Sequence, residues 1–449
     1  MAKVHPSWKK SGNSFEQPYG FQEQLYSKIA VPPGERGLFL IGTYVSFKYT
    51  GTLRDLIPVF QKAWIQMRHQ FPALAALTTE KGKIYHSPNQ YELEEWAKET
   101  FKVQRQKNGA ELFRDLTKTT YATLHYLPEF NELFLQSEHH HLDGRGVMHF
   151  WDEFFEAILR PKDVVFGIEF ERLPPRSDDL LALNEKVVGR GKDLAASLLQ
   201  PLSSGEPISM PVANINASPS RNFSLELKFS VRDTTAIIQA CKKRNFTLTA
   251  VWHAAMALAT QEIQKSAGGS PGTKFMGFSN FNLRGYFPKS NDTHAYTVSN
   301  HHTVLPVVVE PDGKSFDEIA SQLTKFYRTG LSQPADIWCA LKPMIEEVTP
   351  LFTSGDMTDT TPAVSSLGNI EPYIKRKYGS DWEIEDVWFG DTVTGPWIEG
   401  FLWAWRNRLV LCSCYNSGFY TPRDVEAFQE KVAQVMMENL GLYDPQSRL

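Results

Sequence analysis

The segment 139–144, with the sequence HHHLDG, carries the side chains of this 449-residue protein that are best suited to chemistry. A neutral imidazole has an ordinary pKa of roughly 6.5, so it accepts a proton near neutral pH. An alcohol or amine that attacks a carbonyl must lose a proton, and a placed imidazole takes it. We therefore expect His139 to act as a general base. Asp143 would fold back to fix the turn and the ring, and Gly144 would allow a backbone conformation that a side chain forbids.

Two other interpretations of this segment stay open, a metal site and a solvated polar turn. Neighbouring side chains of an extended backbone point to opposite faces, so three consecutive histidines do not easily share one ion. His139 and His141 could share a face, but no nearby carboxylate or cysteine completes a familiar zinc pattern. We expect no bound metal and no permanently bound cofactor.

The elements around the motif are expected to be a strand followed by a helix. Residues 132–138 read as a strand, and 147–159 read as an amphipathic helix. The apolar stripe of this helix consists of Met148, Trp151, Phe154, Phe155 and Ile158. In layered α/β folds, the carboxyl end of a strand is where sites are commonly built.

Strand and helix patterns alternate through both halves of the chain, which predicts an α/β fold. Strands are expected at 38–47, 121–126, 224–231, 276–283, 303–309, 363–369, 401–405 and 409–415. Helices are expected at 52–71 with Thr52 as N-cap, at 232–243, 249–265 and 316–329, and at 421–440 with Thr421 as N-cap and Pro422 first. Between the halves, residues 173–222 are rich in Pro, Ser and Gly, which favours a covering segment or crossover. We therefore expect domains at 1–172 and 223–449, separated by this segment.

Charge and cysteine content exclude several classes of protein. Lys plus Arg is 47 and Asp plus Glu is 51, a net charge of −4 that argues against a broad nucleic-acid or anionic-membrane surface. Residues 1–20 contain no apolar segment typical of a secretory signal, and no stretch reaches the roughly 18 apolar residues of a membrane span. Four cysteines do not make a disulfide scaffold, and Cys412 and Cys414 are expected to be core thiols on one strand face. We expect a cytoplasmic monomer.

The histidine motif resembles that of the CoA-dependent acyltransferase superfamily, which includes BAHD acyltransferases, fungal trichothecene O-acetyltransferases and the condensation domains of peptide synthetases. Three further segments are similar to family segments in the same order along the chain: 246–259 (FTLTAVWHAAMALA), 280–284 (NFNLR) and 365–369 (SSLGN). Two features depart from the family patterns. Glu138 stands where condensation domains usually carry a first histidine, and 386–391 (DVWFGD) matches the plant Asp-Phe-Gly-Trp-Gly motif poorly.

The resemblance implies two chloramphenicol-acetyltransferase-like domains, each a mixed β-sheet with flanking helices, with an active-site channel between them. It implies that Arg284 pairs with Asp143, so that Asp143, Gly144 and Arg284 support the site. Ser365, Ser366 or a backbone N–H could stabilise the oxyanion or line the channel. Acyl-CoA would be the cosubstrate and a small-molecule alcohol the acceptor.

The most similar members by pattern are fungal O-acetyltransferases of secondary metabolites, which predicts transfer of an acyl group, most simply acetyl, to a hydroxyl of a terpenoid or polyketide. Two alternatives keep the fold. One is a free-standing condensation-type enzyme that takes its acyl or peptidyl group from a carrier protein. The other is a cyclase or binding protein that performs no acyl transfer.

Overall fold

The computed structural model describes residues 5–181, 188–268, 272–288, 296–332, 336–353 and 358–442. Its internal contacts divide the chain into two compact units. Unit 1 comprises Met1–Leu183, Asn282–His302 and Ile370–Thr392, and unit 2 comprises Asn184–Phe281, Thr303–Asn369 and Val393–Leu449. This division differs from cuts near residues 172 and 222, because two segments from the second half of the chain fold with the first half.

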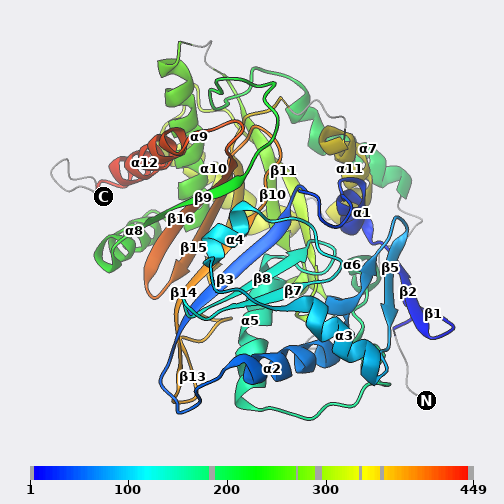
Figure 1. Ribbon diagram of the computed structural model, residues 1–449. Helices are drawn as coiled ribbons and strands as arrows, with labels where there is room; N and C mark the ends of the chain where they lie inside the picture. The colour runs from blue at the N-terminus through cyan, green and yellow to red at the C-terminus, as the bar shows by residue number, and fades with distance from the viewer. Residues whose placement is uncertain are drawn as a thin grey trace. The chain divides into compact units, whose positions relative to one another are not determined.

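Unit 1 is built on a six-stranded sheet with strand order β13–β14–β3–β8–β7–β6 (Figure 1). The strands are β3 (Leu40–Tyr49), β6 (Phe101–Val103), β7 (Thr123–Leu127), β8 (Glu132–Glu138), β13 (Lys377–Tyr378) and β14 (Trp382–Asp391). A smaller sheet, in the order β1–β2–β5–β4, consists of β1 (Lys9–Ser11), β2 (Ser14–Pro18), β4 (Leu77–Thr78) and β5 (Gly82–His86). The helices are α1 (Phe21–Lys28), α2 (Ile57–Gln70), α3 (Gln90–Thr100), α4 (Gly109–Arg114), α5 (Gly144–Leu159) and α6 (Ser177–Leu180).

The two central strands of the main sheet explain how distant residues reach the motif. β8 lies between β3 and β7, and β14 pairs antiparallel with β3 on the other side. Ile41 of β3 is therefore opposite Ser137 on one side and Asp391 on the other. The end of β14 is thus brought to the end of β8, more than 250 residues away in the sequence.

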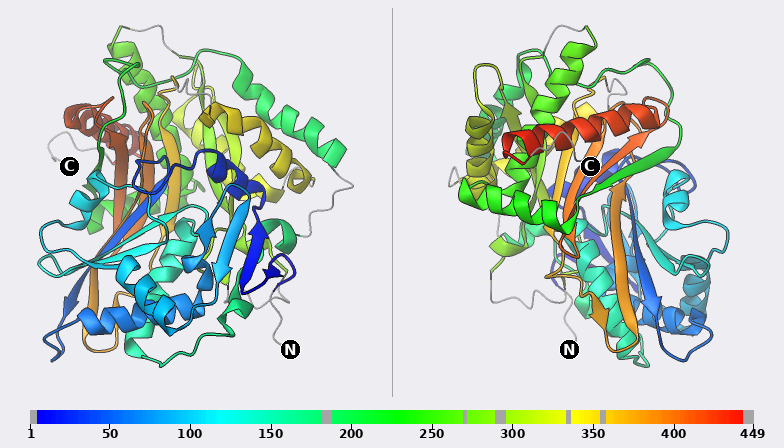
Figure 2. Two further views of the ribbon diagram at one scale, coloured as in Figure 1. Left: turned by 45° about the vertical axis from the view of Figure 1, so that its right-hand side comes forward. Right: turned by 90° about the vertical axis from the view of Figure 1, so that its left-hand side faces the viewer.

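Unit 2 is built on a second six-stranded sheet, in the order β11–β10–β12–β15–β16–β9. Its strands are β9 (Asn222–Lys228), β10 (Phe275–Asn282), β11 (His302–Val309), β12 (Ala363–Asn369), β15 (Glu399–Trp405) and β16 (Arg408–Asn416). Its helices are α7 (Val188–Leu199), α8 (Val231–Lys243), α9 (Leu248–Ser266), α10 (Phe316–Thr329), α11 (Ile337–Thr353) and α12 (Pro422–Asn439). The apolar helix α9 packs against α10 and α12, and α12 also contacts β9 and β16 (Figure 2).

Several features predicted from local sequence can be compared directly with the structure. Thr421 caps α12, where its hydroxyl accepts the N–H of Asp424, and Pro422 is the first helical residue as predicted. Cys412 and Cys414 are both buried on β16, as expected for core thiols. The Pro-rich stretch 173–222, predicted as a covering segment or crossover, contains the helix α7, which packs against α11.

The start of α2 is five residues later than predicted. The helix begins at Ile57, not near Thr52, because the Asp55 carboxylate accepts the N–H of Ile57 and Pro58 occupies the first turn. Leu53 fits the helical period but is 54% exposed. Leu53 therefore follows the apolar period of the helix without packing into the core.

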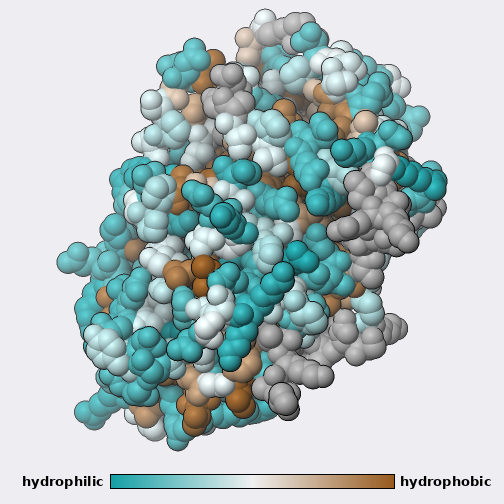
Figure 3. All heavy atoms as spheres, turned by 90° about the vertical axis from the view of Figure 1, so that its right-hand side faces the viewer, coloured by the Kyte–Doolittle hydropathy of each residue, from teal (hydrophilic) through white to brown (hydrophobic). Residues whose placement is uncertain are grey.

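The surface drawn in Figure 3 is mostly hydrophilic, with hydrophobic side chains in small separate groups. Within the described ranges, no helix is long and apolar enough to cross a lipid bilayer.

Candidate active site

The histidine motif forms the turn between β8 and α5, in the predicted order of strand, loop and helix. β8 ends at Glu138, and α5 begins at Gly144 with Asp143 as its N-cap. The apolar stripe of α5 is buried, which anchors the helix that follows the turn. The turn is therefore held between a central strand and a well-packed helix.

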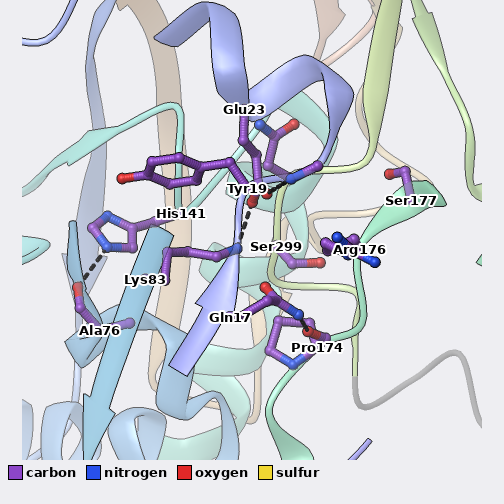
Figure 4. Close-up of polar contacts among 12 residues, drawn as sticks. Gln17, Tyr19, Glu23, Ala76, Lys83, His141, Pro174, Arg176, Ser177 and Ser299 are labelled. Carbon is purple, nitrogen blue, oxygen red and sulfur yellow. Dashed lines mark hydrogen bonds and ion pairs between the residues drawn. The ribbon is translucent and has the colours of Figure 1, made fainter. Parts of the chain in front are cut away.

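The three imidazoles of the turn point to different partners. Nε2 of His139 lies 3.4 Å from Oδ2 of Asp391, and Nδ1 of His140 lies 3.6 Å from Oε1 of Glu138. His141 is directed to the Ala76 carbonyl at 2.9 Å (Figure 4). In the part of the chain that the structure describes, no three His, Cys, Asp or Glu side chains are grouped to hold a metal ion.

The Asp143 carboxylate is buried and fully hydrogen-bonded. Its Oδ2 accepts from Nη1 of Arg284 at 2.8 Å and from the N–H of His301 at 2.7 Å, and its Oδ1 accepts from the N–H of Gly146 at 2.6 Å. Burial alone would raise the pKa of Asp143, but the Arg284 guanidinium lowers it well below its usual range. The expected contact between Asp143 and Arg284 is thus present, and it ties the turn to the segment 282–302.

Arg284 makes further bonds that shape this segment. Its Nη2 donates to the carbonyls of Thr297 and Ser299 at 3.1 and 2.6 Å, and its Nη1 donates to Oδ1 of Asn282 at 3.1 Å. Only 13% of its side chain is exposed. One buried cation therefore holds both ends of the segment and the N-cap of α5.

The glycine that the turn requires is not the one predicted. Gly144 is the first residue of α5 and is helical, so it needs no conformation reserved for glycine. At Gly146, a Cβ would lie 2.4 Å from the Ser299 carbonyl oxygen. The close approach of the Ser299 backbone to the first turn of α5 explains a glycine there.

His139 lies in the wall of a pocket in unit 1. The pocket is small and is lined by α1, the loop after it, the start of β3 and the residues 138–140. Its Nδ1 is buried with no hydrogen-bond partner among the described residues, and 12% of the side chain is exposed. Nε2 is the ring nitrogen that faces the Asp391 carboxylate.

Four residues near His139 were missed by reasoning from the sequence. The Tyr26 ring stacks on the imidazole, with ring centroids 4.6 Å apart and planes 8° apart. His302 lies 5.5 Å from it by ring centroids, and the Asn300 side chain donates to the His139 carbonyl at 2.6 Å. Asp391 is the fourth. The polar run SNHH at 299–302, directly before a β-rich segment, was the only local signal for two of them.

Ser365 and Ser366 lie on β12 in unit 2, where they pair with Phe401 and Leu402 of β15. The Ser366 hydroxyl shares a hydrogen bond of 2.8 Å with that of Thr249 on α9. Gly368 takes a φ of +71° where the β12–β15 register shifts. A role for either serine in oxyanion stabilisation stays a prediction.

Glu138 is ionised and supports the turn from the strand side. It accepts from Thr78 at 2.9 Å and pairs with Lys118 at 3.0 Å. Burial alone would raise its pKa, but His140, His141 and Lys118 lower it to about 2. At the position where condensation domains carry their first histidine, this chain therefore has a negatively charged side chain that faces His140.

Acid is expected to destabilise the protein through its buried neutral histidines. Burial lowers the pKa of His141 to about 4 and that of His302 to about 3, from an ordinary value of 6.5. Below pH 6.5 the unfolded chain binds protons that the folded chain does not, so stability is lost as the pH falls toward 4. At pH 5 each histidine accounts for ~2 kcal/mol of this loss.

The measurement is the thermal unfolding midpoint between pH 7.5 and 5. The midpoint should fall with pH, and less steeply in His141→Gln, which keeps a donor for Ala76. His86→Gln, at an exposed position on β5, is the matched control and should follow the wild type. A midpoint independent of pH over this range would contradict the prediction.

Comparison with known proteins finds relatives that align with nearly the whole chain. No family model matches. Acetyltransferase pigO of Monascus ruber is 27% identical, with 97% of this chain and 98% of the relative covered. O-acetyltransferase pigM of the same organism is 24% identical over 90% of this chain and 82% of its own. A protein of Epichloe uncinata that is named a loline-cluster transcription factor, lolU1, is 24% identical over 98% of both chains.

Solved structures confirm the predicted fold class. TRI3, the trichothecene 15-O-acetyltransferase of Fusarium sporotrichioides, has a TM-score of 0.80 at 19% identity, with 98% of this chain and 99% of that chain covered. A condensation domain of the calcium-dependent antibiotic synthetase has a TM-score of 0.60 at 13% identity, with 91% and 92% covered. The chain shares their two-domain α/β fold.

Proposed function

We propose that this O-acyltransferase moves an acetyl group from acetyl-CoA to a hydroxyl of a fungal secondary metabolite, with His139 as the general base. The observation that supports this most strongly is the placement of His139. Its imidazole lines a pocket, while the turn that carries it is fixed by the Asp143–Arg284 ion pair. The acetyltransferase relatives favour the acetyl donor and a metabolite acceptor.

The proposed reaction is direct transfer. Nε2 of His139 accepts the proton of the acceptor hydroxyl while that oxygen attacks the thioester carbonyl. The tetrahedral intermediate then collapses, the carbon–sulfur bond breaks, and the imidazolium returns its proton to the leaving thiolate. The products are the acetyl ester and free CoA.

Asp391 has a clear electrostatic part in this scheme. Its carboxylate oxygen lies 3.4 Å from Nε2 of His139, in a place where both side chains are largely buried. A negative charge at this distance favours the imidazolium that forms when the hydroxyl proton is taken.

The test compares donors and follows thiol release. Purified protein receives acetyl-CoA or an acetylated carrier protein, together with a trichothecene that carries a free 15-hydroxyl or with other terpenoid and polyketide alcohols. We expect release of CoA that depends on the acceptor, and binding of CoA detectable by calorimetry. Transfer from the carrier protein alone would favour the condensation-type alternative. Absence of CoA binding would contradict the proposal and favour a non-acyltransferase.

A further inference from the structure

A chain of three hydrogen bonds links the backbone of His139 to the tyrosine that stacks on its ring. The Asn300 amide nitrogen donates to the His139 carbonyl at 2.6 Å, and Oδ1 of Asn300 lies 2.7 Å from Nδ1 of His302. Nε2 of His302 lies 2.8 Å from the Tyr26 hydroxyl, and the Tyr26 ring stacks on the His139 imidazole. The chain therefore begins at the backbone of His139 and ends at the face of its ring.

The chemistry of the groups fixes the direction of every bond in this chain. The His139 carbonyl only accepts, so Asn300 turns its NH₂ group toward it and its oxygen toward His302. That oxygen needs a donor, which places the proton of His302 on Nδ1. Nε2 of His302 is then an acceptor, and the Tyr26 hydroxyl donates to it.

The state of His302 is consistent with this assignment. The side chain is buried, and burial, followed by the neighbouring His139, lowers its pKa to about 3. His302 is therefore neutral near pH 7 and carries a single ring proton. A charged His302 would have to donate at both nitrogens and would place a second cation near the imidazolium of the reaction.

We propose that Asn300, His302 and Tyr26 are positioning residues that hold the His139 imidazole in the orientation needed to accept a proton. Asn300 fixes the backbone of His139, and Tyr26 fixes the plane of its ring. His302 bonds to both Asn300 and Tyr26, so that neither side chain moves alone. The Asp143 carboxylate does not perform this task, because its hydrogen bonds go to Arg284 and to the backbone N–H groups of Gly146 and His301. This inference rests on the proposed function, since it concerns the same base.

The activity test uses Tyr26→Phe, which keeps the stacked ring and removes only the hydroxyl. Misplacement of a catalytic group by a fraction of an ångström lowers turnover sharply, so we expect kcat to fall on the order of tenfold while KM for acetyl-CoA stays within about twofold. Tyr26→Ala also removes the stack and should cost on the order of a hundredfold. Tyr19→Phe is the matched control: its ring lies against His140, its hydroxyl donates to Thr79, and its activity should equal that of the wild type.

Two further results distinguish positioning from a general structural role. Asn300→Ala should lower kcat, and adding Tyr26→Phe to it should lower kcat little further. The effects of two substitutions in one hydrogen-bond network are not additive. ¹⁵N-histidine NMR should show His302 with its proton on Nδ1, and Tyr26→Phe should change the Nε2 signal. This spectrum does not depend on turnover, so it tests the chain even if the proposed acetyl transfer is wrong. Wild-type kcat in Tyr26→Phe, full additivity, or an Nε2-protonated His302 would overturn the inference.

Discussion

Replacement of His139 by alanine is expected to lower kcat for acetyl transfer by about 10²- to 10⁴-fold. The variant loses the proposed base, whose imidazole lines the pocket with Nε2 beside the Asp391 carboxylate. It keeps the backbone carbonyl to which Asn300 donates, so the turn and the N-cap of α5 should persist. The measurement is thiol release from acetyl-CoA with an acceptor, alongside circular dichroism to establish folding.

A neighbouring histidine supplies the control for this prediction. His141→Gln changes the same turn but keeps a donor for the Ala76 carbonyl. It should retain turnover close to that of the wild type. Equal losses in both variants would show that the turn tolerates no change. Wild-type turnover in the His139→Ala variant would reject the assignment of the base.

Arg284→Met is expected to destabilise the protein by about 3–5 kcal/mol, because it leaves the buried Asp143 carboxylate without its cation. The lost guanidinium no longer bonds to the carbonyls of Thr297 and Ser299, so residues 297–301 should loosen from α5. Activity should fall with it, since Asn300 lies in the same segment. The measurement is the free energy of unfolding in urea.

Two variants show whether the buried charge causes this effect. Asp143→Asn combined with Arg284→Met removes both charges and keeps one side-chain oxygen, which can accept the N–H of Gly146 or of His301. The double variant should therefore be more stable than the sum of the single losses predicts. Arg105→Met breaks an exposed ion pair with Glu129 at 3.1 Å and should cost about 0–1 kcal/mol. Similar losses for Arg105→Met and Arg284→Met would contradict the account.

Elements fixed by local patterns could be predicted from the sequence, and elements fixed by distant partners could not. The turn between β8 and α5 and the cap at Thr421 follow from side chains within a few residues. β14 escaped prediction because its ten residues include several charges, and pairing with β3 gives the segment its strand geometry. α11 was missed because it contains Pro343 and Pro350, which normally argue against a helix.

The site divides in the same way. The Asp143–Arg284 pair could be inferred because the resemblance linked two short motifs, although 141 residues separate them. Tyr26 and His302 are 276 residues apart, and neither belongs to a motif. Their contact arises from the fold of unit 1, which brings α1 and the start of β11 to the end of β8. Asp391 lies in a segment that matches the plant motif poorly, so no sequence pattern indicated that it lies near His139. The register between β14 and β3 brings it there.

The most direct test of the central claim is a structure of the protein with bound CoA. We expect the sulfur of CoA to lie near Nε2 of His139, with room for an acceptor oxygen at a reacting distance of about 3.5 Å from the thioester carbon. The imidazole should remain stacked on Tyr26. A sulfur bound elsewhere, or an imidazole closed off from it by packed side chains, would contradict proton transfer by His139.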